Sequence, residues 1–229
     1  MRIKSYLIVI AFLLSIAGLY GQPKIKAVPG TNIDFGDVYE GTKVERVVTI
    51  KNVGTDTLLI SEVKAQCGCT ATLMTEKKLA PSDSGKLSIT FDTHNYGGQK
   101  AIKHVYVSSN DTSNAKYTIE FTANVLNVLD VAPKFLSFDS SKLESTYVKT
   151  VTISNPGKES LKILSVETKF DQMKVNLMKN QLMPGEQTQL QAVFHPTKSG
   201  TFQGSIDLTT NNPIKPKYEI KFFCWVNRK

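Results

Sequence analysis

Hydrophobic and polar residues alternate with a period of two along most of this chain. Val48 and Ile50 flank the polar Thr49, and the same spacing places Leu87, Ile89 and Phe91 on one side of a later segment. A period of two with one polar side predicts antiparallel strands that bury one face. Turn-forming residues separate these segments, among them Asn52-Val53-Gly54, Pro81-Ser82-Asp83, Gly97-Gly98, Asn110-Asp111 and Asn211-Asn212-Pro213. No helical period follows the first twenty residues, so the pattern predicts an all-β protein.

The alternating pattern occurs twice. The segment Val48–Gly54 matches Val151–Gly157 at an offset of 103 residues, and after a two-residue deletion Tyr117–Phe121 matches Tyr218–Phe222 at an offset of 101. A repeat of about a hundred residues is longer than the units of solenoid proteins, which span 20 to 50 residues. Each copy is therefore expected to be a domain with its own core.

The strand pattern predicts the fold of each copy. About seven short strands per hundred residues, with turns every 8 to 12 residues, are typical of an immunoglobulin-like β-sandwich. The expected organisation is a signal peptide at residues 1–21, a first sandwich domain at 22–130 and a second at 131–229. Domains of this size can be held by hydrophobic cores alone.

The first residues have the layout of a secretory signal peptide. Arg2 and Lys4 precede a fifteen-residue apolar run from Tyr6 to Tyr20, and a polar chain begins at Gly21. This run is shorter than the roughly 20 residues that span a membrane, although an uncleaved anchor remains an alternative. The sequence thus predicts export, with no membrane span in the mature chain.

The net charge points to no particular partner. The chain carries a formal charge of +8, which falls to +6 when Arg2 and Lys4 leave with the signal peptide. The lysines are scattered, and no run reaches the five or more basic residues expected of a nucleic-acid-binding tail. We therefore expect no nucleic-acid partner and interpret the charge as a solvated surface.

One cysteine pair is the clearest candidate for chemistry. Cys67 and Cys69 flank Gly68, whereas the second copy has Phe170 and Gln172 at the two cysteine positions, so the fold does not require the thiols. In an extended strand two such residues lie about 7 Å apart, which is too far for a disulfide. Gly68 would permit a kink that closes the gap and forms a small, easily reduced ring.

Three interpretations of the pair remain open. The first is a local disulfide with a structural or idle role, as an oxidising compartment favours. The second is a redox-active or thiol-sensing pair, and the third is a soft-metal site for copper(I) or zinc. Zinc sites usually need four ligands at wider spacing, and of the histidines only His94 is expected to approach the pair. No cofactor is expected unless the third interpretation holds.

The other histidines are expected to have no ligand role. His104 alternates with the core positions Val105 and Val107 and should face solvent, and His195 precedes Pro196 in the second copy. Metal-ligating histidines normally come in clusters, so each is interpreted as a surface residue.

The last strand of the chain holds a second candidate site. Cys224 aligns with Ala123 and is expected in the core, where free cysteines are common and inert. Phe223 and Trp225 fall on the opposite face, where the first copy has Thr122 and Asn124. Two aromatic residues on a polar face need a cover, which is either a loop or the other domain, or a binding partner.

No enzymatic motif accompanies these features. The chain contains no nucleophile elbow, phosphate-binding loop or paired carboxylates at a meaningful spacing, so the protein is expected not to be an enzyme.

The first copy resembles the bacterial DUF1573 family. The resemblance rests on the Cys-Gly-Cys-Thr stretch at Cys67–Thr70, preceded by Asp34-Phe35-Gly36 and Lys51–Gly54, and followed by Pro81, Gly85, Phe91-Asp92-Thr93 and Ser109-Asn110-Asp111. The second copy lacks the cysteines. It is similar to the broader ASPM/SPD-2/Hydin and major-sperm-protein-like immunoglobulin modules, through Phe138, Asn155-Pro156-Gly157, Pro184-Gly185, Phe194-His195-Pro196 and Gly200.

The resemblance implies an exported envelope protein with an immunoglobulin-like fold and no established activity. Together with the Gly21-Gln22 junction it suggests the periplasm or extracellular face of a Gram-negative bacterium similar to the Bacteroidetes. Two hypotheses follow. The first is a non-enzymatic binding or scaffolding module whose partner is an envelope protein or a glycan, with Phe223 and Trp225 as a partner surface. The alternative is a redox-active or soft-metal protein that acts through Cys67 and Cys69, with His94 as a weak additional candidate.

Overall fold

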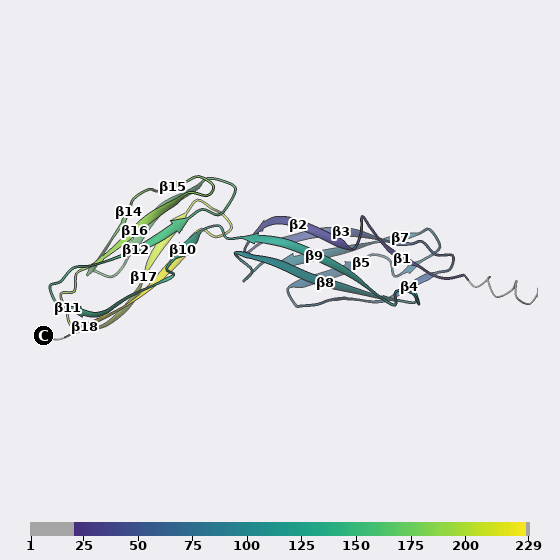
Figure 1. Ribbon diagram of the computed structural model, residues 1–229, viewed down its shortest axis with the longest axis horizontal. Coiled ribbons are helices and arrows are strands. Elements are labelled where there is room, and N and C mark those ends of the chain that lie inside the picture. Colours follow the sequence, from purple (N-terminus) through teal and green to yellow (C-terminus); the bar gives the residue numbers. More distant parts are fainter. Residues whose placement is uncertain (1–20, 228–229) are drawn as a thin grey trace, which may run out of the picture. The chain divides into compact units, whose positions relative to one another are not determined.

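The computed structural model describes residues 21–227, and every regular element in that range is a β-strand (Figure 1). The all-β prediction is therefore confirmed. Within residues 21–227 no helix is long and apolar enough to cross a membrane. The predicted signal peptide lies almost entirely in residues 1–20, which are outside the described part of the chain.

The first copy forms two facing sheets. One sheet has the strand order β1-β3-β7-β5 and the other has the order β2-β9-β8-β4-β6. The nine strands are β1 (Ile25–Val28), β2 (Asn32–Tyr39), β3 (Lys43–Asn52), β4 (Leu58–Ala65), β5 (Thr70–Met74), β6 (Lys78–Leu79), β7 (Ser84–Asp92), β8 (Gln99–Ser109) and β9 (Lys116–Leu126). Two sheets packed face to face form the predicted β-sandwich.

The second copy has the same topology, with each strand number raised by nine. Its sheets have the orders β10-β12-β16-β14 and β11-β18-β17-β13-β15. The strands are β10 (Asp130–Ala132), β11 (Phe135–Lys142), β12 (Tyr147–Ser154), β13 (Leu161–Thr168), β14 (Met173–Leu177), β15 (Gln181–Leu182), β16 (Gln187–Phe194), β17 (Gly200–Thr210) and β18 (Lys217–Asn227). The chain thus contains two immunoglobulin-like domains.

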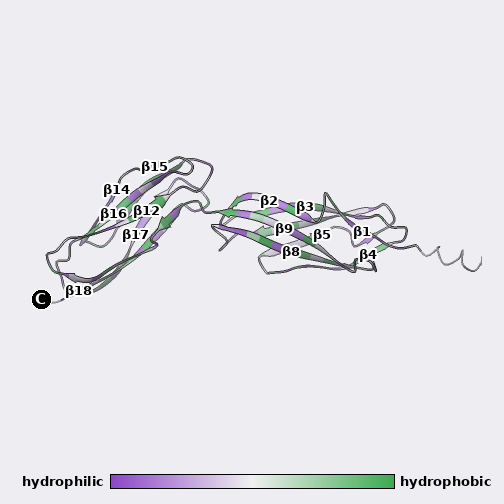
Figure 2. Cartoon of the chain, in the orientation of Figure 1, coloured by the Kyte–Doolittle hydropathy of each residue, from purple (hydrophilic) through white to green (hydrophobic). Residues whose placement is uncertain are grey.

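Hydrophobic residues that alternate with polar ones along the strands supply both cores, and Figure 2 shows both kinds of residue on the strands. In the first domain Phe91 and Phe121 are fully buried, with ring centroids 5.5 Å apart. In the second domain Phe194 and Phe222 are fully buried at the equivalent positions. The second core already includes Val128 and Leu129, which precede β10. Burying apolar area of this kind is the main force that holds such domains together.

The chain separates into two compact units that differ slightly from the two copies. Unit 1 comprises the described residues up to Gly36, Lys43–Asp92 and Ala101–Ala123, and unit 2 comprises Asp37–Thr42, Thr93–Lys100 and the described residues from Asn124. Two loops of the first copy therefore belong to unit 2.

A buried asparagine closes one turn in each domain in the same way. The side-chain amide of Asn52 donates to the carbonyl oxygens of Asp56 at 2.7 Å and Leu79 at 3.0 Å, and its oxygen accepts from the Gly54 N–H at 2.9 Å. A Cβ at residue 54 would lie 2.1 Å from the Gln22 carbonyl oxygen, so glycine is required there.

The second domain repeats this turn in full. Asn155 donates to the carbonyl oxygens of Glu159 at 2.7 Å and Leu182 at 3.0 Å, and accepts from the Gly157 N–H at 2.9 Å. In both domains the asparagine satisfies backbone groups that the turn would otherwise leave unpaired.

Candidate functional site

The cysteine pair lies in the loop that leads from β4 into β5. The β4 side of the loop is held by a hydrogen bond from the Gln66 N–H to the His104 carbonyl oxygen at 2.9 Å. On the β5 side, the Asp92 N–H donates to the Cys69 carbonyl oxygen at 2.9 Å. The loop is therefore fixed to β8 at one end and to β7 at the other.

Cys67 and Cys69 form a disulfide, and their Cα atoms are 5.3 Å apart. The prediction of a local disulfide is thus met in the structure, and the chain turns at Gly68, as the predicted kink requires. The Gly68 backbone is not in the left-handed region, and a Cβ at this position would meet no atom of any residue other than its two neighbours within 4 Å. The ring therefore closes without the conformational freedom of glycine, and the loop tip is exposed and lacks a side chain.

Thr70 is the polar side chain that faces the disulfide. Its hydroxyl oxygen lies 3.7 Å from the Cys67 sulfur and 3.8 Å from the Cys69 sulfur, and the residue is only 7% exposed. The Thr70 N–H also donates to the Cys67 carbonyl oxygen at 3.3 Å. The sequence pattern assigns Thr70 no role beyond its place in the Cys-Gly-Cys-Thr motif, although its equivalent in the second copy is the apolar Met173.

The equivalent loop in the second domain keeps two of the backbone hydrogen bonds but has no cysteine or threonine at these positions. The Met173 N–H donates to the Phe170 carbonyl oxygen at 3.1 Å, and the His195 N–H donates to the Gln172 carbonyl oxygen at 2.9 Å. These bonds are the equivalents of those around Cys67 and Cys69. Phe170 fills the cysteine position, and its ring packs 5.4 Å from Phe222. The loop conformation therefore does not depend on a disulfide.

His104 lies beside the loop on the outer face of its sheet. Its Nδ1 is 3.0 Å from the Gln66 side-chain oxygen and its Nε2 is 3.2 Å from a Glu120 carboxylate oxygen. Because the His104 backbone N–H also donates to the Gln66 oxygen at 3.2 Å, the ring nitrogen Nδ1 acts as a donor. His104 thus orients the side chain that precedes Cys67.

The other histidines lie on exposed loops. His94 follows β7 and is exposed, and His195 contacts Thr146 at 3.2 Å and Glu144 at 3.4 Å. Among residues 21–227 no three or more His, Cys, Asp or Glu side chains are grouped so that they could hold a metal ion.

The second candidate site is the outer face of the sheet that contains β18. Cys224 is a free, buried thiol, and burial followed by the nearby Asp139 charge raises its pKa to about 12. Phe223 is half-buried and Trp225 is 50% exposed. No loop of unit 2 therefore covers Trp225 completely.

Strand pairing adds a third aromatic residue to this face. Phe135 on β11 is 53% exposed and pairs with Lys221, next to the pair formed by Ser137 and Phe223. On the other side of β18, Gln203 of β17 pairs with Phe223. Paired residues lie on the same side of a sheet. We call Phe135, Phe223 and Trp225 the aromatic face; the sequence did not reveal Phe135 because the β11–β18 pairing was not predicted.

A shallow groove of about 570 Å³ runs beside part of this face. Its lining combines Phe135 and Phe223 with the polar Gln203, Ser205 and Glu219. Repeat one has polar residues at the matching places, where the Thr122 hydroxyl donates to Asp34 at 3.2 Å. The aromatic face is therefore specific to the second domain.

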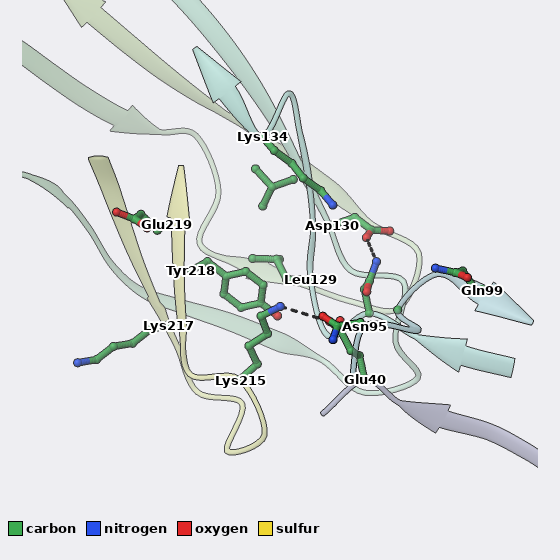
Figure 3. A pocket seen from close by; sticks show the side chains of 13 residues that line it. Glu40, Asn95, Gln99, Leu129, Asp130, Lys134, Lys215, Lys217, Tyr218 and Glu219 are labelled. Atoms are coloured by element: carbon green, nitrogen blue, oxygen red, sulfur yellow. Dashed lines mark hydrogen bonds and ion pairs between the residues drawn. The ribbon is translucent and has the colours of Figure 1, made fainter. Parts of the chain in front are cut away.

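A polar pocket of unit 2 has a volume of about 480 Å³, and all of its lining residues belong to that unit (Figure 3). Its charged side chains are partly paired, because Lys215 lies 3.3 Å from Glu40 and the Asn127 amide donates to Asp130 at 2.5 Å. The buried Tyr218 hydroxyl has no hydrogen-bond partner among the described residues. Burial, with smaller contributions from Glu40 and Asp130, raises the pKa of Tyr218, so it stays a neutral phenol.

Comparisons with solved structures show similarity at low identity. A protein of unknown function from Porphyromonas gingivalis W83 is 15% identical with a TM-score of 0.39, and the match covers 88% of this chain and 99% of that one. The ASH/PapD-like domain 7 of human CEP192 is 10% identical with a TM-score of 0.38, covering 44% of this chain and 87% of the domain. The secreted serine protease VesC from Vibrio cholerae is 13% identical with a TM-score of 0.35, covering 82% and 49%.

No curated protein sequence matches the chain. Sequence models of two families do match it, each over one of the two domains. Residues 27–125 match DUF1573, a family described as proteins of unknown function. Residues 127–222 match the HYDIN/CFA65/VesB-like immunoglobulin-like domain. The first domain is therefore similar to DUF1573 proteins, and the second is similar to the HYDIN/CFA65/VesB-like immunoglobulin-like domain.

Proposed function

We propose that this protein is an exported, non-enzymatic binding module of a bacterial envelope, and that the aromatic face of its second domain holds an envelope protein or a glycan. The observation that carries the proposal is the exposure of two large rings on one strand-paired surface, with Trp225 50% and Phe135 53% exposed. Clustered exposed apolar side chains of this kind mark interaction sites on soluble domains.

The composition of the face supports recognition of a partner rather than chance exposure. Aromatic residues are enriched at interfaces because they bury a large area at a small cost in side-chain entropy. The polar groups of Gln203, Ser205 and Glu219 line the same groove and supply hydrogen-bond donors and acceptors at its edge. Flat rings beside such groups suit either a protein surface or the pyranose rings of a glycan.

The experiment compares the intact chain with a variant that has the repeat-one residues on this face, Phe223→Thr with Trp225→Asn. Purified proteins are sedimented with peptidoglycan sacculi and, separately, passed over immobilised envelope proteins. We expect binding to fall at least tenfold, because a few aromatic side chains usually carry most of the affinity of an interface. Val148→Thr is the control, since Val148 is also exposed but lies on β12 of the opposite sheet. Equal binding by the double variant and the intact chain in both assays would refute the proposal.

Export has its own test. The mature protein recovered from the cell envelope should lack about 17 to 21 residues, as signal-peptide cleavage requires. Full-length protein found only in the cytoplasm would contradict the proposed location in the envelope.

A second function is favoured by the cysteine loop. The disulfide Cys67–Cys69 has the Thr70 hydroxyl beside both sulfurs, which suits a redox-active pair. Under this alternative the pair equilibrates with thiol buffers at a reduction potential above about −300 mV, the range of labile disulfides. A potential well below that value would leave the disulfide a structural element.

A further inference from the structure

We propose that Cys67 and Cys69 form a thiol–disulfide exchange centre for dithiol substrates, and that the Thr70 hydroxyl stabilises the cysteine thiolate formed when the disulfide opens. The inference rests on the redox function proposed above and assigns it a substrate class and a third participating residue.

The position of Thr70 is fixed by the fold. Thr70 is the first residue of β5 and pairs with Phe91 of β7. Its N–H is bonded to the Cys67 carbonyl oxygen, and only 7% of the residue is exposed. The hydroxyl is thus held 3.7 and 3.8 Å from the two sulfurs.

The Thr70 hydroxyl makes only a weak hydrogen bond to the sulfurs of the oxidised pair. The sulfur of a neutral cysteine is a weak acceptor, whereas an ionised acceptor forms a hydrogen bond about twice as strong as a neutral one. The bond from Thr70 therefore gains strength when a Cys67 or Cys69 thiolate is created. A contact that strengthens during a step favours that step over its reverse.

The open tip of the loop gives a substrate access to the pair. Gly68 is exposed, and a Cβ placed on it would meet no atom within 4 Å apart from those of the neighbouring Cys67 and Cys69. A residue with a side chain would fit the backbone here, so the glycine is not needed for the conformation. Cys67 and Cys69 are themselves partly exposed, so an approaching thiol can reach the pair from this side.

The exchange transfers two electrons from the substrate dithiol to the Cys67–Cys69 pair. A substrate thiolate attacks one sulfur of the pair, a mixed disulfide forms, and the electron pair of the broken S–S bond passes to the other cysteine as a thiolate that accepts from Thr70. The second substrate thiol loses its proton and attacks the substrate sulfur of the mixed disulfide, which releases the second cysteine. The substrate dithiol becomes a disulfide, the Cys67–Cys69 pair is reduced by two electrons, and the two substrate protons pass to the cysteine thiolates or to solvent.

The second domain shows that the fold does not require a hydroxyl at the position of Thr70. There the equivalent loop keeps its backbone hydrogen bonds with Phe170, Gln172 and Met173 in place of Cys67, Cys69 and Thr70. A strand that began with an apolar residue would therefore serve the sandwich equally well.

The experiment uses the full chain with Cys224→Ala, so that every thiol counted comes from the pair; alanine is the residue at the equivalent position, Ala123. Thr70→Val removes the hydroxyl and keeps the shape, and Thr70→Ser keeps the hydroxyl. Each protein is equilibrated with dithiothreitol and with glutathione buffers, and the exchange is quenched in acid. The free thiols are then alkylated and counted by mass spectrometry. We expect Thr70→Val to lower the dithiol-to-disulfide ratio about tenfold, which corresponds to about 30 mV, and to slow reduction to a similar degree. Thr70→Ser should stay within threefold of the parent protein.

Further measurements separate this role from a structural one. Iodoacetamide alkylation of the reduced pair should require a higher pH in Thr70→Val, because a less stabilised thiolate forms later as pH rises. Thermal unfolding of the oxidised proteins is compared first, and Thr70→Ala replaces Thr70→Val if the valine protein does not fold. Thr70 variants that match the parent within twofold in ratio and rate would overturn the role of Thr70 alone. A parent disulfide that stays oxidised in excess reduced glutathione would overturn the exchange function itself.

Discussion

Asp111 accepts a hydrogen bond from the backbone N–H of Ile25 at 2.9 Å, and this bond ties the loop after β8 to the first strand of the chain. Asp111 is only 1% exposed and also accepts from the N–H groups of Ser113 at 2.9 Å and Asn114 at 3.2 Å. Burial by itself raises the pKa of Asp111, but these donors together outweigh it, and the pKa lies below its ordinary value.

The first domain should therefore lose stability in acid through Asp111. A folded-state pKa below the unfolded value of about 3.9 means that the carboxylate contributes stability above that pH, and that the contribution disappears as pH falls through the folded pKa. Asp111→Asn should cost about 1–2 kcal/mol at pH 7, because hydrogen bonds to a charged acceptor are stronger, and the difference should shrink below pH 4. Urea unfolding at pH 7 and pH 3 measures both effects.

The second domain provides the control for this measurement. Asn212 occupies the position equivalent to Asp111 and accepts from the Ile214 N–H at 2.9 Å. Trp225 is the single tryptophan of the chain, so its fluorescence follows the second domain only. A pH-independent difference between the Asp111 proteins, or an equal change in the tryptophan transition, would contradict the prediction.

Asn52 should be indispensable for the first domain. Asn52→Asp keeps the size of the side chain but removes both donor hydrogens, which leaves the Asp56 and Leu79 carbonyl oxygens facing a carboxylate. We expect a loss of at least about 3 kcal/mol in the free energy of unfolding, the usual result of unpaired buried polar groups. Asn155→Asp should act in the same way on the second domain, and chemical denaturation of both variants checks the expectation. A loss below about 1 kcal/mol in either variant would show that the turn tolerates unpaired carbonyl groups.

Each domain should unfold cooperatively as an isolated fragment. The domain bounds predicted from the sequence, 22–130 and 131–229, give the fragments 23–130 and 131–229. The second core, however, includes Val128 and Leu129. A fragment of residues 127–229 should therefore be several kcal/mol more stable than 131–229, since each buried side chain contributes about 1.5–3 kcal/mol. Differential scanning calorimetry distinguishes the two. If neither 23–130 nor 127–229 shows a cooperative transition, the domains do not have independent cores.

Replacing both Cys67 and Cys69 by serine should change the stability little. The disulfide closes a ring with one intervening residue, and such short loops restrict the unfolded chain least. We expect the free energy of unfolding to change by less than about 1 kcal/mol, as measured by urea denaturation of the oxidised parent and the variant. A loss of several kcal/mol would instead show that the disulfide fills the end of the core as Phe170 does in the second domain.

The strands were predictable because burial of one face imposes a period of two that any reader of the sequence can see. The alignment of the two copies also placed Cys224 in the core and showed that Phe223 and Trp225 have no aromatic equivalents in the first domain. These predictions needed only local pattern and the comparison of one copy with the other.

The remaining features depend on contacts between distant segments. Phe135 joins the aromatic face through the parallel pairing of β11 with β18, and parallel pairing leaves no local signal. The role of Thr70 required the position of its hydroxyl relative to two sulfurs. The kink at Gly68 was predictable from residue type, but only the structure shows that the kink uses no left-handed backbone.

The loops Cys67–Thr70 and Phe170–Met173 have matching backbone hydrogen bonds, so the cysteine motif can be moved from the first domain to the second. Because Phe170–Met173 keeps both backbone hydrogen bonds that hold Cys67–Thr70, the sequence Cys-Gly-Cys-Thr can be built into the second domain on the same backbone, with loss of the ring contacts that Phe170 makes there. In such a variant of the second domain, the exchange chemistry of the cysteine pair can be studied separately from the first domain.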